Sequence, residues 1–142
     1  RLIDMGVDPY LIAPTLLMVI GQRLVRKLCP DSRKEKFLEG AFKEIAQNEL
    51  KNMPDEVRKK IISFDKIYEG VSSPVCPMGS RGRMGIFEVL YKTPALESII
   101  LTKPSEQDIM KESRKQGMLT VKEDGLIKMF NGLISFDEFL KL

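Results

Sequence analysis

Residues 80–90 read Ser-Arg-Gly-Arg-Met-Gly-Ile-Phe-Glu-Val-Leu, and the rest of the chain is organised around them. Glycines and arginines open the stretch, and an apolar run that carries one carboxylate, Glu88, closes it. From Arg83 to Leu90 both alternate faces are mainly apolar, which is typical of a strand that is covered on both sides. The sequence therefore predicts a turn that leads into a buried strand.

Glu88 needs a partner in such a strand, because burial of a carboxylate is costly unless a charge or hydrogen bond compensates. Arg23, Arg26 and Arg83 are the candidate partners. We expect a structural ion pair between Glu88 and one of these arginines to lock two strands together. The alternative hypothesis is a nucleotide-linked role for Glu88, with Arg23 and Arg26 as phosphate ligands.

The composition of the 142 residues is that of an ordinary globular protein, with 43% hydrophobic and 30% charged residues. The net charge of +3 is too small to indicate direct binding of nucleic acid. The longest nearly apolar run, residues 11–21, is shorter than the roughly 20 residues that span a bilayer, so we expect no transmembrane segment. The chain begins with Arg1 and not with Met, which indicates a fragment of a longer protein.

Histidine is absent from the sequence, which excludes a Ser-His-Asp triad, a Cys-His pair and a histidine-based metal site built from this chain alone. Neither Gly-x-x-x-x-Gly-Lys-Ser/Thr nor Gly-x-Gly-x-x-Gly occurs, and no Lys-Ser/Thr follows Gly79, Gly82 and Gly85. We therefore expect no catalytic residue and no cofactor in this chain.

The first half of the chain alternates between apolar and polar segments. Asp8-Pro9 predicts a helix start, and Pro14 limits that helix to a turn or two. Residues 16–28 fit a buried strand or a buried helix, and their β-branched residues favour the strand. A polar break is expected at residues 30–36. A helix over residues 37–50, a short helix after Pro54 and a short strand over residues 64–68 follow.

The last third predicts short helices with individual N-caps. The capping residues are Thr93, Ser105, Thr120 and Ser135, and the pairs Thr120–Glu123 and Ser135–Glu138 form capping boxes. Isolated helices of this length are marginal in water, so we expect them to pack together. The expected fold class is α+β, mainly α.

The two cysteines stand in mirrored contexts, Cys29-x-x-Ser32 and Ser73-x-x-Cys76. Two Cys-x-x-Cys knuckles would indicate structural zinc, but each has a serine in place of one thiol. Cys29 and Cys76 are therefore weak candidates for a metal, and we expect no zinc. Two reduced cysteines are the favoured interpretation, and a disulfide is the alternative.

Four blocks in order resemble one family, the secretion-superfamily ATPases of the GspE/PilB type, which are the motors of type II secretion and type IV pilus assembly. The blocks are Arg-Leu-Ile-Asp-Met-Gly-Val-Asp-Pro-Tyr-Leu-Ile (residues 1–12), Gln-Arg-Leu-Val-Arg-Lys-Leu-Cys (22–29), Gly-Arg-Met-Gly-Ile-Phe-Glu-Val-Leu (82–90) and Gln-Gly-Met-Leu-Thr-Val-Lys-Glu-Asp-Gly-Leu (116–126). Gln22, Gly82 and Gly85 are residues of these motifs. Residues 30–75 match poorly, and Ser80 stands where the family often has an aromatic residue.

The resemblance implies a cytoplasmic hexameric motor for protein transport, with a RecA-like ATP-binding core that uses Mg²⁺. Its phosphate-binding, acidic and histidine motifs would lie before Arg1, so this chain would be the C-terminal part of the motor. The implied partners are the other subunits of a homo-hexamer and the inner-membrane platform protein, through which the motor would be peripheral to the inner membrane. Family members often carry a four-cysteine zinc insertion between the positions of Cys29 and Cys76.

Three domains are expected on this basis: the end of the RecA-like core (residues 1–29), a degenerate zinc-knuckle-like insertion (30–82) and a C-terminal helical domain (83–142). Two other hypotheses stay open. The chain could be a non-enzymatic helical adaptor, which a native start codon near Arg1 would favour, or a small zinc-stabilised domain, which metal analysis would test.

Overall fold

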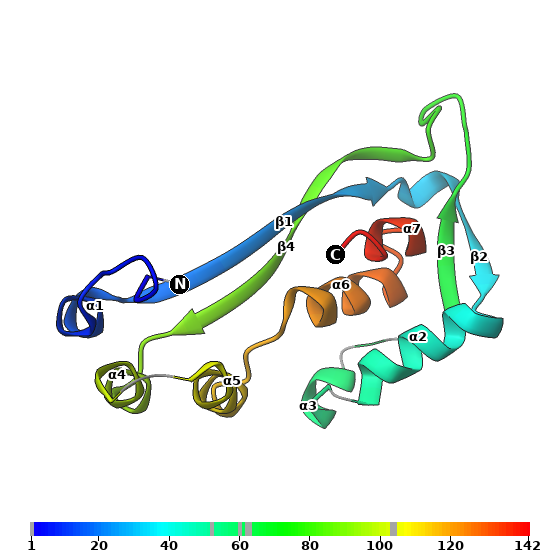
Figure 1. Ribbon diagram of the computed structural model, residues 1–142. Helices are drawn as coiled ribbons and strands as arrows, with labels where there is room; N and C mark the ends of the chain where they lie inside the picture. The colour runs from blue at the N-terminus through cyan, green and yellow to red at the C-terminus, as the bar shows by residue number, and fades with distance from the viewer. Residues whose placement is uncertain (1, 52, 60, 62–63, 103–104) are drawn as a thin grey trace. The chain divides into compact units, whose positions relative to one another are not determined.

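Helices and strands follow one another along the chain in the computed structural model, which describes residues 2–51, 53–59, 61, 64–102 and 105–142 (Figure 1). The strands form two two-stranded sheets, one of β1 and β4 and one of β2 and β3. In chain order the elements are α1 (Pro9–Thr15), β1 (Met18–Leu28), the 3-10 turn η1 (Pro30–Ser32), β2 (Arg33–Phe37), α2 (Gly40–Lys51), α3 (Asp55–Arg58), β3 (Lys66–Gly70), β4 (Ser80–Tyr91), α4 (Pro94–Leu101), α5 (Glu106–Lys115), α6 (Val121–Phe130) and α7 (Phe136–Phe139).

The chain divides into two compact units, each of which is made of two segments. Unit 1 consists of residues 1–21 and 88–119, and unit 2 consists of residues 22–87 and 120–142. Strands β1 and β4 contribute residues to both units. This division does not follow the three domains expected from the sequence, whose limits stay predictions, as does the assignment of residues 1–29 to a RecA-like core.

Unit 1 is built on capped helices. The predicted N-caps are confirmed: Asp8 Oδ1 accepts from the N–H of Tyr10 at 2.9 Å, and Thr93 Oγ1 accepts from the N–H of Leu96 at 3.1 Å. Ser105 Oγ accepts from the N–H of Asp108. Helices α1 and α4 pack together through a small buried core of Ile12, Ala13, Leu96 and Ile100.

Unit 2 has its core around α6, which packs against α2, β3 and α7. The largest fully buried apolar side chains of this unit are Phe130, Ile86, Leu126, Met129 and Ile134. The capping box of α6 is confirmed, because Thr120 Oγ1 accepts from the N–H of Glu123 and Glu123 Oε2 accepts from the N–H of Thr120. The second predicted box is only half formed: Ser135 caps α7, but the Glu138 carboxylate bonds elsewhere.

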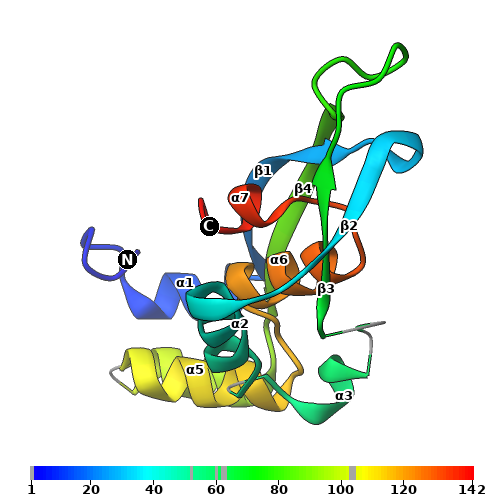
Figure 2. The ribbon, with the colours of Figure 1, turned by 90° about the vertical axis from the view of Figure 1, so that its right-hand side faces the viewer.

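Strand β2 corrects the polar break expected at residues 30–36. It pairs antiparallel with β3, with Arg33 opposite Gly70 and Phe37 opposite Lys66 (Figure 2). Opposite charges face each other across the pair, and Lys66 Nζ lies 2.8 Å from Glu35 Oε2. Most residues of β2 are charged, so its sequence shows little hydrophobic periodicity. The sequence pattern therefore did not predict this strand.

Strands β1 and β4 form where they are predicted, but the expectation that they are buried is wrong. In β1 only Val25 and Leu28 are buried, and in β4 only Ile86 is buried. Both strands lie at the edge of their sheet, because a sheet of two strands has no central strand. In these two strands, apolar residues occur on both faces although most of these residues are not buried. The apolar pattern alone therefore does not predict burial of both faces.

Candidate functional site

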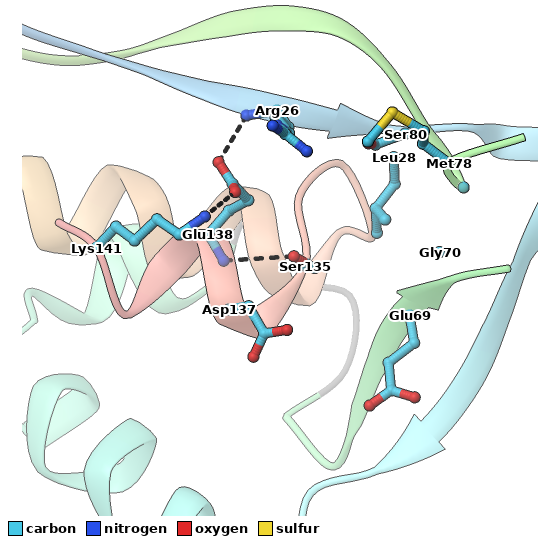
Figure 3. Close-up of a pocket in the computed structure, with 11 residues that line it drawn as sticks. Arg26, Leu28, Glu69, Gly70, Met78, Ser80, Ser135, Asp137, Glu138 and Lys141 are labelled. Carbon is cyan, nitrogen blue, oxygen red and sulfur yellow. Dashed lines mark hydrogen bonds and ion pairs between the residues drawn. The ribbon is translucent and has the colours of Figure 1, made fainter. Parts of the chain in front are cut away.

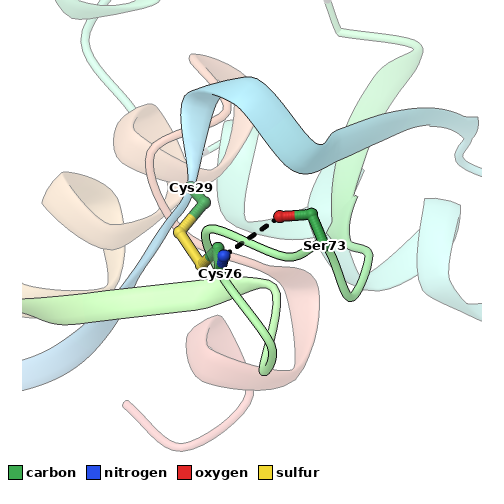
Figure 4. Close-up of a disulfide and its surroundings, with 3 residues drawn as sticks. All are labelled: Cys29, Ser73 and Cys76. Carbon is green, nitrogen blue, oxygen red and sulfur yellow. Dashed lines mark hydrogen bonds between the residues drawn. A yellow bond between two sulfur atoms is a disulfide. The ribbon is translucent and has the colours of Figure 1, made fainter.

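Cys29 and Cys76 form a disulfide in unit 2, with their Cα atoms 6.7 Å apart (Figure 4). The prediction of two reduced cysteines is therefore wrong. Cys29 follows β1 and Cys76 precedes β4, and the N–H of Cys29 donates to the carbonyl of Gly79 at 3.1 Å. That hydrogen bond brings the two segments together although the cysteines are 47 positions apart in the sequence, a proximity that residue spacing does not reveal.

The serines of the two mirrored motifs lie beside the disulfide. Ser73 Oγ accepts from the N–H of Cys76 at 3.0 Å, and the main chains of Ser73 and Cys76 exchange two hydrogen bonds of 3.1 Å (Figure 4). Ser32 Oγ is buried and has no hydrogen-bond partner among the described residues. The four-cysteine zinc site that the resemblance implies does not fit these residues, because two positions hold serine and the two thiols are joined to each other.

A polar pocket of about 500 Å³ lies in the same unit (Figure 3). Charged side chains of both signs line it, with Arg26 from β1, Asp137 and Glu138 from α7, and Lys141 after α7. Gly79 and Ser80, where the 80–90 stretch begins, also line the pocket. The pocket therefore brings together the second sequence block, the residues that lead into β4 and the end of the chain.

Both carboxylate oxygens of Glu138 accept hydrogen bonds in this pocket. Its Oε2 accepts from the main-chain N–H of Arg26 at 2.8 Å, and its Oε1 accepts from Lys141 Nζ. Burial by itself raises the pKa of Glu138, but the bonds and charges of Lys141 and Arg26 outweigh that effect and lower the pKa below its ordinary value of 4.5. The Glu138 carboxylate is therefore ionised at neutral pH and serves as an acceptor that joins α7 to β1.

This pocket has the chemistry of a structural joint. Its carboxylates are Glu69, Asp137 and Glu138, and its hydroxyls are Ser80 and Ser135. No imidazole can act as a base here, because the sequence has no histidine. In the part of the chain that the structure describes, no three His, Cys, Asp or Glu side chains are grouped so that they could hold a metal ion.

The residues predicted to form the ion pair are divided between the two units. Glu88 belongs to unit 1 and is half-buried, whereas Arg23, Arg26 and Arg83 belong to unit 2 and are exposed. Glu88 Cβ lies 3.5 Å from the position that a Cβ on Gly21 would take. The pairing of Glu88 with an arginine stays a prediction, as does its alternative as a phosphate site.

The three family-motif residues, Gln22, Gly82 and Gly85, lie at different positions in β1 and β4. Gln22 is exposed in β1, and Arg23 Nη1 donates to its carbonyl at 3.4 Å. Gly82 has a φ of +72°, a left-handed conformation that glycine adopts readily. Gly85 contacts the ring of Phe87 so closely that a Cβ there would lie 2.4 Å from Cζ.

Two residues of α6 hold the middle of β4, and the sequence analysis missed them. The N–H of Phe87 donates to Asp124 Oδ2 at 2.8 Å, and Lys128 Nζ donates to the carbonyl of Gly85 at 2.9 Å. Asp124 and Lys128 also pair with each other at 2.5 Å. Their spacing of four residues on a predicted helix is the signal that could have identified the pair, although not its partner strand.

Among the described residues, the structure contains no helix that combines the length and the apolar character needed to cross a membrane.

The class of protein follows from comparison with known sequences. The family described as "Type II/IV secretion system protein" matches residues 1–141, so the chain belongs to this family. That match confirms the family inferred from the four sequence blocks.

Individual relatives agree with the family match. The chain is 35% identical over 140 residues to the type IV pilus assembly ATPase PilB of Pseudomonas aeruginosa, a match that covers 97% of this chain and 23% of the relative. It is 36% identical over 143 residues to the type II secretion system ATPase E of Vibrio cholerae, covering 100% of this chain and 26% of the relative. It is 31% identical to the protein transport protein HofB homolog of Escherichia coli, covering 100% of this chain and 28% of that protein. The chain thus spans about a quarter of the length of these relatives.

Proposed function

We propose that the chain is the C-terminal portion of a hexameric motor ATPase that powers type IV pilus assembly or type II protein secretion. The observation that carries the proposal is the match of residues 1–141 to the family, together with relatives whose names include both kinds of ATPase. The longer protein would bind ATP and Mg²⁺ in its RecA-like core. This portion would transmit nucleotide-driven movement to neighbouring subunits and to the membrane platform.

The chemistry of the chain favours a role in transmitting movement and not a role in nucleotide hydrolysis. The sequence has no phosphate-binding loop and no histidine, and the pocket in unit 2 holds paired charges that join elements of the fold. The residues described above bond strands to helices at several points. These joints lie within unit 2, and they allow this unit to move as a rigid body when another domain changes shape.

The surface of unit 1 supports the same proposal. Large apolar side chains are exposed along α1 and the start of β1, and Leu17 has 76%, Tyr10 72% and Leu11 65% of its surface exposed. Met18, Val19 and Ile20 follow in β1 and are also exposed. A contiguous apolar segment of this kind is typical of a surface that another part of a protein covers. In the proposal, the RecA-like core of the longer protein covers it.

We also propose that the longer protein works in the cytoplasm and reaches the inner membrane through its platform partner. The net charge of +3 gives no reason to add nucleic acid to the partners.

The test uses the chain and the longer protein side by side. The native gene should encode Gly-x-x-x-x-Gly-Lys-Ser/Thr and acidic motifs before the codon of Arg1. The longer protein should hydrolyse ATP, whereas residues 1–142 alone should show no hydrolysis above background. ATP hydrolysis by the isolated chain, or a native start codon at Arg1 with no motor sequence before it, would contradict the proposal, and the second result would favour the helical adaptor.

Limited proteolysis tests the covered surface. Residues 10–20 should be cut rapidly in the isolated chain and protected in the longer protein, because the apolar side chains would then be buried. Equal cleavage in both proteins would show that the RecA-like core does not cover this segment. The protease is one that cuts after large apolar residues, and cleavage after Leu140, which has 50% of its surface exposed, provides the internal control.

A further inference from the structure

A second pocket in unit 2 opens directly onto the disulfide. Its volume is about 240 Å³, and both Cys29 and Cys76 line it. Only 8% of Cys29 and 4% of Cys76 is exposed, so a reagent that reaches the sulfur atoms must come close to the other residues of this pocket. Access to the bridge is therefore selective.

The charges at this pocket favour an anion. Lys27 and Arg81 line it from the two strands that flank the bridge, and Asp31 is the one carboxylate among the described lining residues. Lys27 and Arg81 are both exposed. Positive charges beside a disulfide attract an anionic thiol and stabilise the thiolate that leaves when the bridge is cleaved.

We propose that the Cys29–Cys76 bridge is a thiol–disulfide exchange site that reacts with an anionic low-molecular-weight thiol, of the class of a carboxylate-bearing thiol peptide, through this pocket. This inference is independent of the motor assignment, because it rests on the bridge and the residues around it.

The exchange balances with two molecules of the external thiol. The thiolate of the first attacks one sulfur of the bridge, the S–S bond breaks, and the other cysteine leaves as a thiolate and takes up a proton. A second thiolate then attacks the external sulfur of the mixed disulfide. That step releases the oxidised external thiol and the second cysteine thiolate, which is also protonated. Two electrons pass from the two external thiols to the bridge.

The state of the bridge controls the loop that leads into β4. Apart from the bridge, main-chain hydrogen bonds tie residues 71–79 to the rest of the unit: Val71 N–H to the carbonyl of Ser32 at 2.9 Å, and Cys29 N–H to the carbonyl of Gly79 at 3.1 Å. Cys76 lies between Val71 and Gly79 in the sequence. Reduction therefore leaves the loop tied to the unit at its two ends, and its middle keeps the internal Ser73–Cys76 hydrogen bonds but is no longer held to Cys29.

The experiment uses the whole chain in buffers whose ratio of reduced to oxidised glutathione covers oxidising and reducing compartments. Free thiols are alkylated and counted by mass spectrometry at each ratio. The bridge should open and close reversibly without denaturant, and Cys29→Ser and Cys76→Ser variants should each retain one glutathione as a mixed disulfide. A bridge that does not form at any ratio, or that opens only in denaturant, overturns the proposal.

Charge removal tests the role of the pocket. In a Lys27→Gln/Arg81→Gln variant, the rate of reduction by glutathione should fall about 3- to 10-fold, whereas the rate with neutral 2-mercaptoethanol should stay nearly unchanged. A Lys59→Gln/Lys111→Gln variant removes the same charge from exposed positions outside this pocket and should reduce as the parent chain does. Circular dichroism establishes that each variant is folded. Equal loss of rate with both thiols, or equal loss in the control variant, overturns the assignment of the pocket.

Discussion

The main-chain N–H of Arg26 donates a hydrogen bond of 2.8 Å to Oε2 of Glu138, which stands 112 positions later in the chain. Arg26 lies in β1, and Glu138 lies in the short helix α7. Lys141 donates to the other oxygen of the same carboxylate. One side chain therefore bonds the last helix to a strand of the first sequence half, and only 12% of that side chain is exposed.

Replacement of Glu138 by Ala should destabilise unit 2 by about 2 kcal/mol, because hydrogen bonds to a charged group contribute roughly 1.5–3 kcal/mol and the N–H of Arg26 would lose its acceptor. Glu138→Gln keeps a carbonyl oxygen for Arg26 and should cost clearly less. Urea denaturation followed by circular dichroism measures both. Equal losses for Ala and Gln would show that the hydrogen bond to Arg26 has no measurable effect.

The same carboxylate predicts a dependence of stability on pH. The pKa of Glu138 is lower in the folded protein than its ordinary value of 4.5, so the folded state favours the ionised form. Its contribution is complete above pH 4.5 and is lost as the pH falls through the lower folded-state pKa. Urea midpoints of the parent chain should therefore decrease more steeply below pH 4.5 than those of Glu138→Gln. Parallel pH profiles would contradict the prediction.

Local signals in the sequence located most elements of the fold. Asp8, Thr93, Ser105 and Thr120 each cap the helix that they are predicted to cap, because an N-cap depends on three or four neighbouring residues. Strands β1 and β4 also form where apolar, β-branched runs predict them. These features could be predicted because the interactions that produce them join residues that are close together in the sequence.

The missed features depend on contacts between distant residues. The disulfide, the bond from Arg26 to Glu138 and the pairing of Glu35 with Lys66 join residues that are 47, 112 and 31 positions apart. Nothing in the local pattern of Ser135-Phe-Asp-Glu138 shows that Glu138 bonds to a strand and not to its own helix start. The capping box was therefore a sound prediction for Ser135 and a wrong one for Glu138.

Removal of the bridge should lower the stability of unit 2 substantially. Cross-linking residues 47 positions apart restricts the unfolded chain by about 4 kcal/mol in the loop-entropy estimate. A Cys29→Ser/Cys76→Ser variant should thus unfold at lower urea than the oxidised parent and should no longer respond to dithiothreitol. The reduced parent should match the variant closely. A midpoint that is the same with and without the bridge would contradict this prediction.

Gly79 should not tolerate a side chain, because a Cβ there would lie 2.4 Å from the carbonyl carbon of Gly70 and the φ of Gly79 is +64°. Gly82 has a similar φ of +72° but no atom within 4 Å of its Cβ position, so it is the matched control. Gly82→Ala should cost about 1 kcal/mol from backbone strain alone. Gly79→Ala should cost clearly more, and thermal unfolding measures the difference. Equal costs would show that the close approach of Gly70 and Gly79 is not maintained.

Thr93 links two helices of unit 1 through one hydroxyl. Its Oγ1 accepts from the N–H of Leu96 at 3.1 Å and lies 2.9 Å from Oε1 of Glu112, to which the hydroxyl donates. Glu112 is only 6% exposed, and Lys115 lies 3.7 Å from its other oxygen. Thr93→Val keeps the shape but removes the helix cap and a bond to a buried carboxylate, so unit 1 should lose about 2–3 kcal/mol.

Thr93→Ser is the control, because it keeps the hydroxyl and removes only a methyl group, and it should cost less than about 1 kcal/mol. Hydrogen exchange of the amides in α4 and α5 separates the two effects of Thr93→Val. Loss of the cap raises exchange at the start of α4, whereas loss of the bond to Glu112 raises exchange in α5. If Val and Ser gave the same protection in both helices, the hydroxyl of Thr93 would not be the link between them.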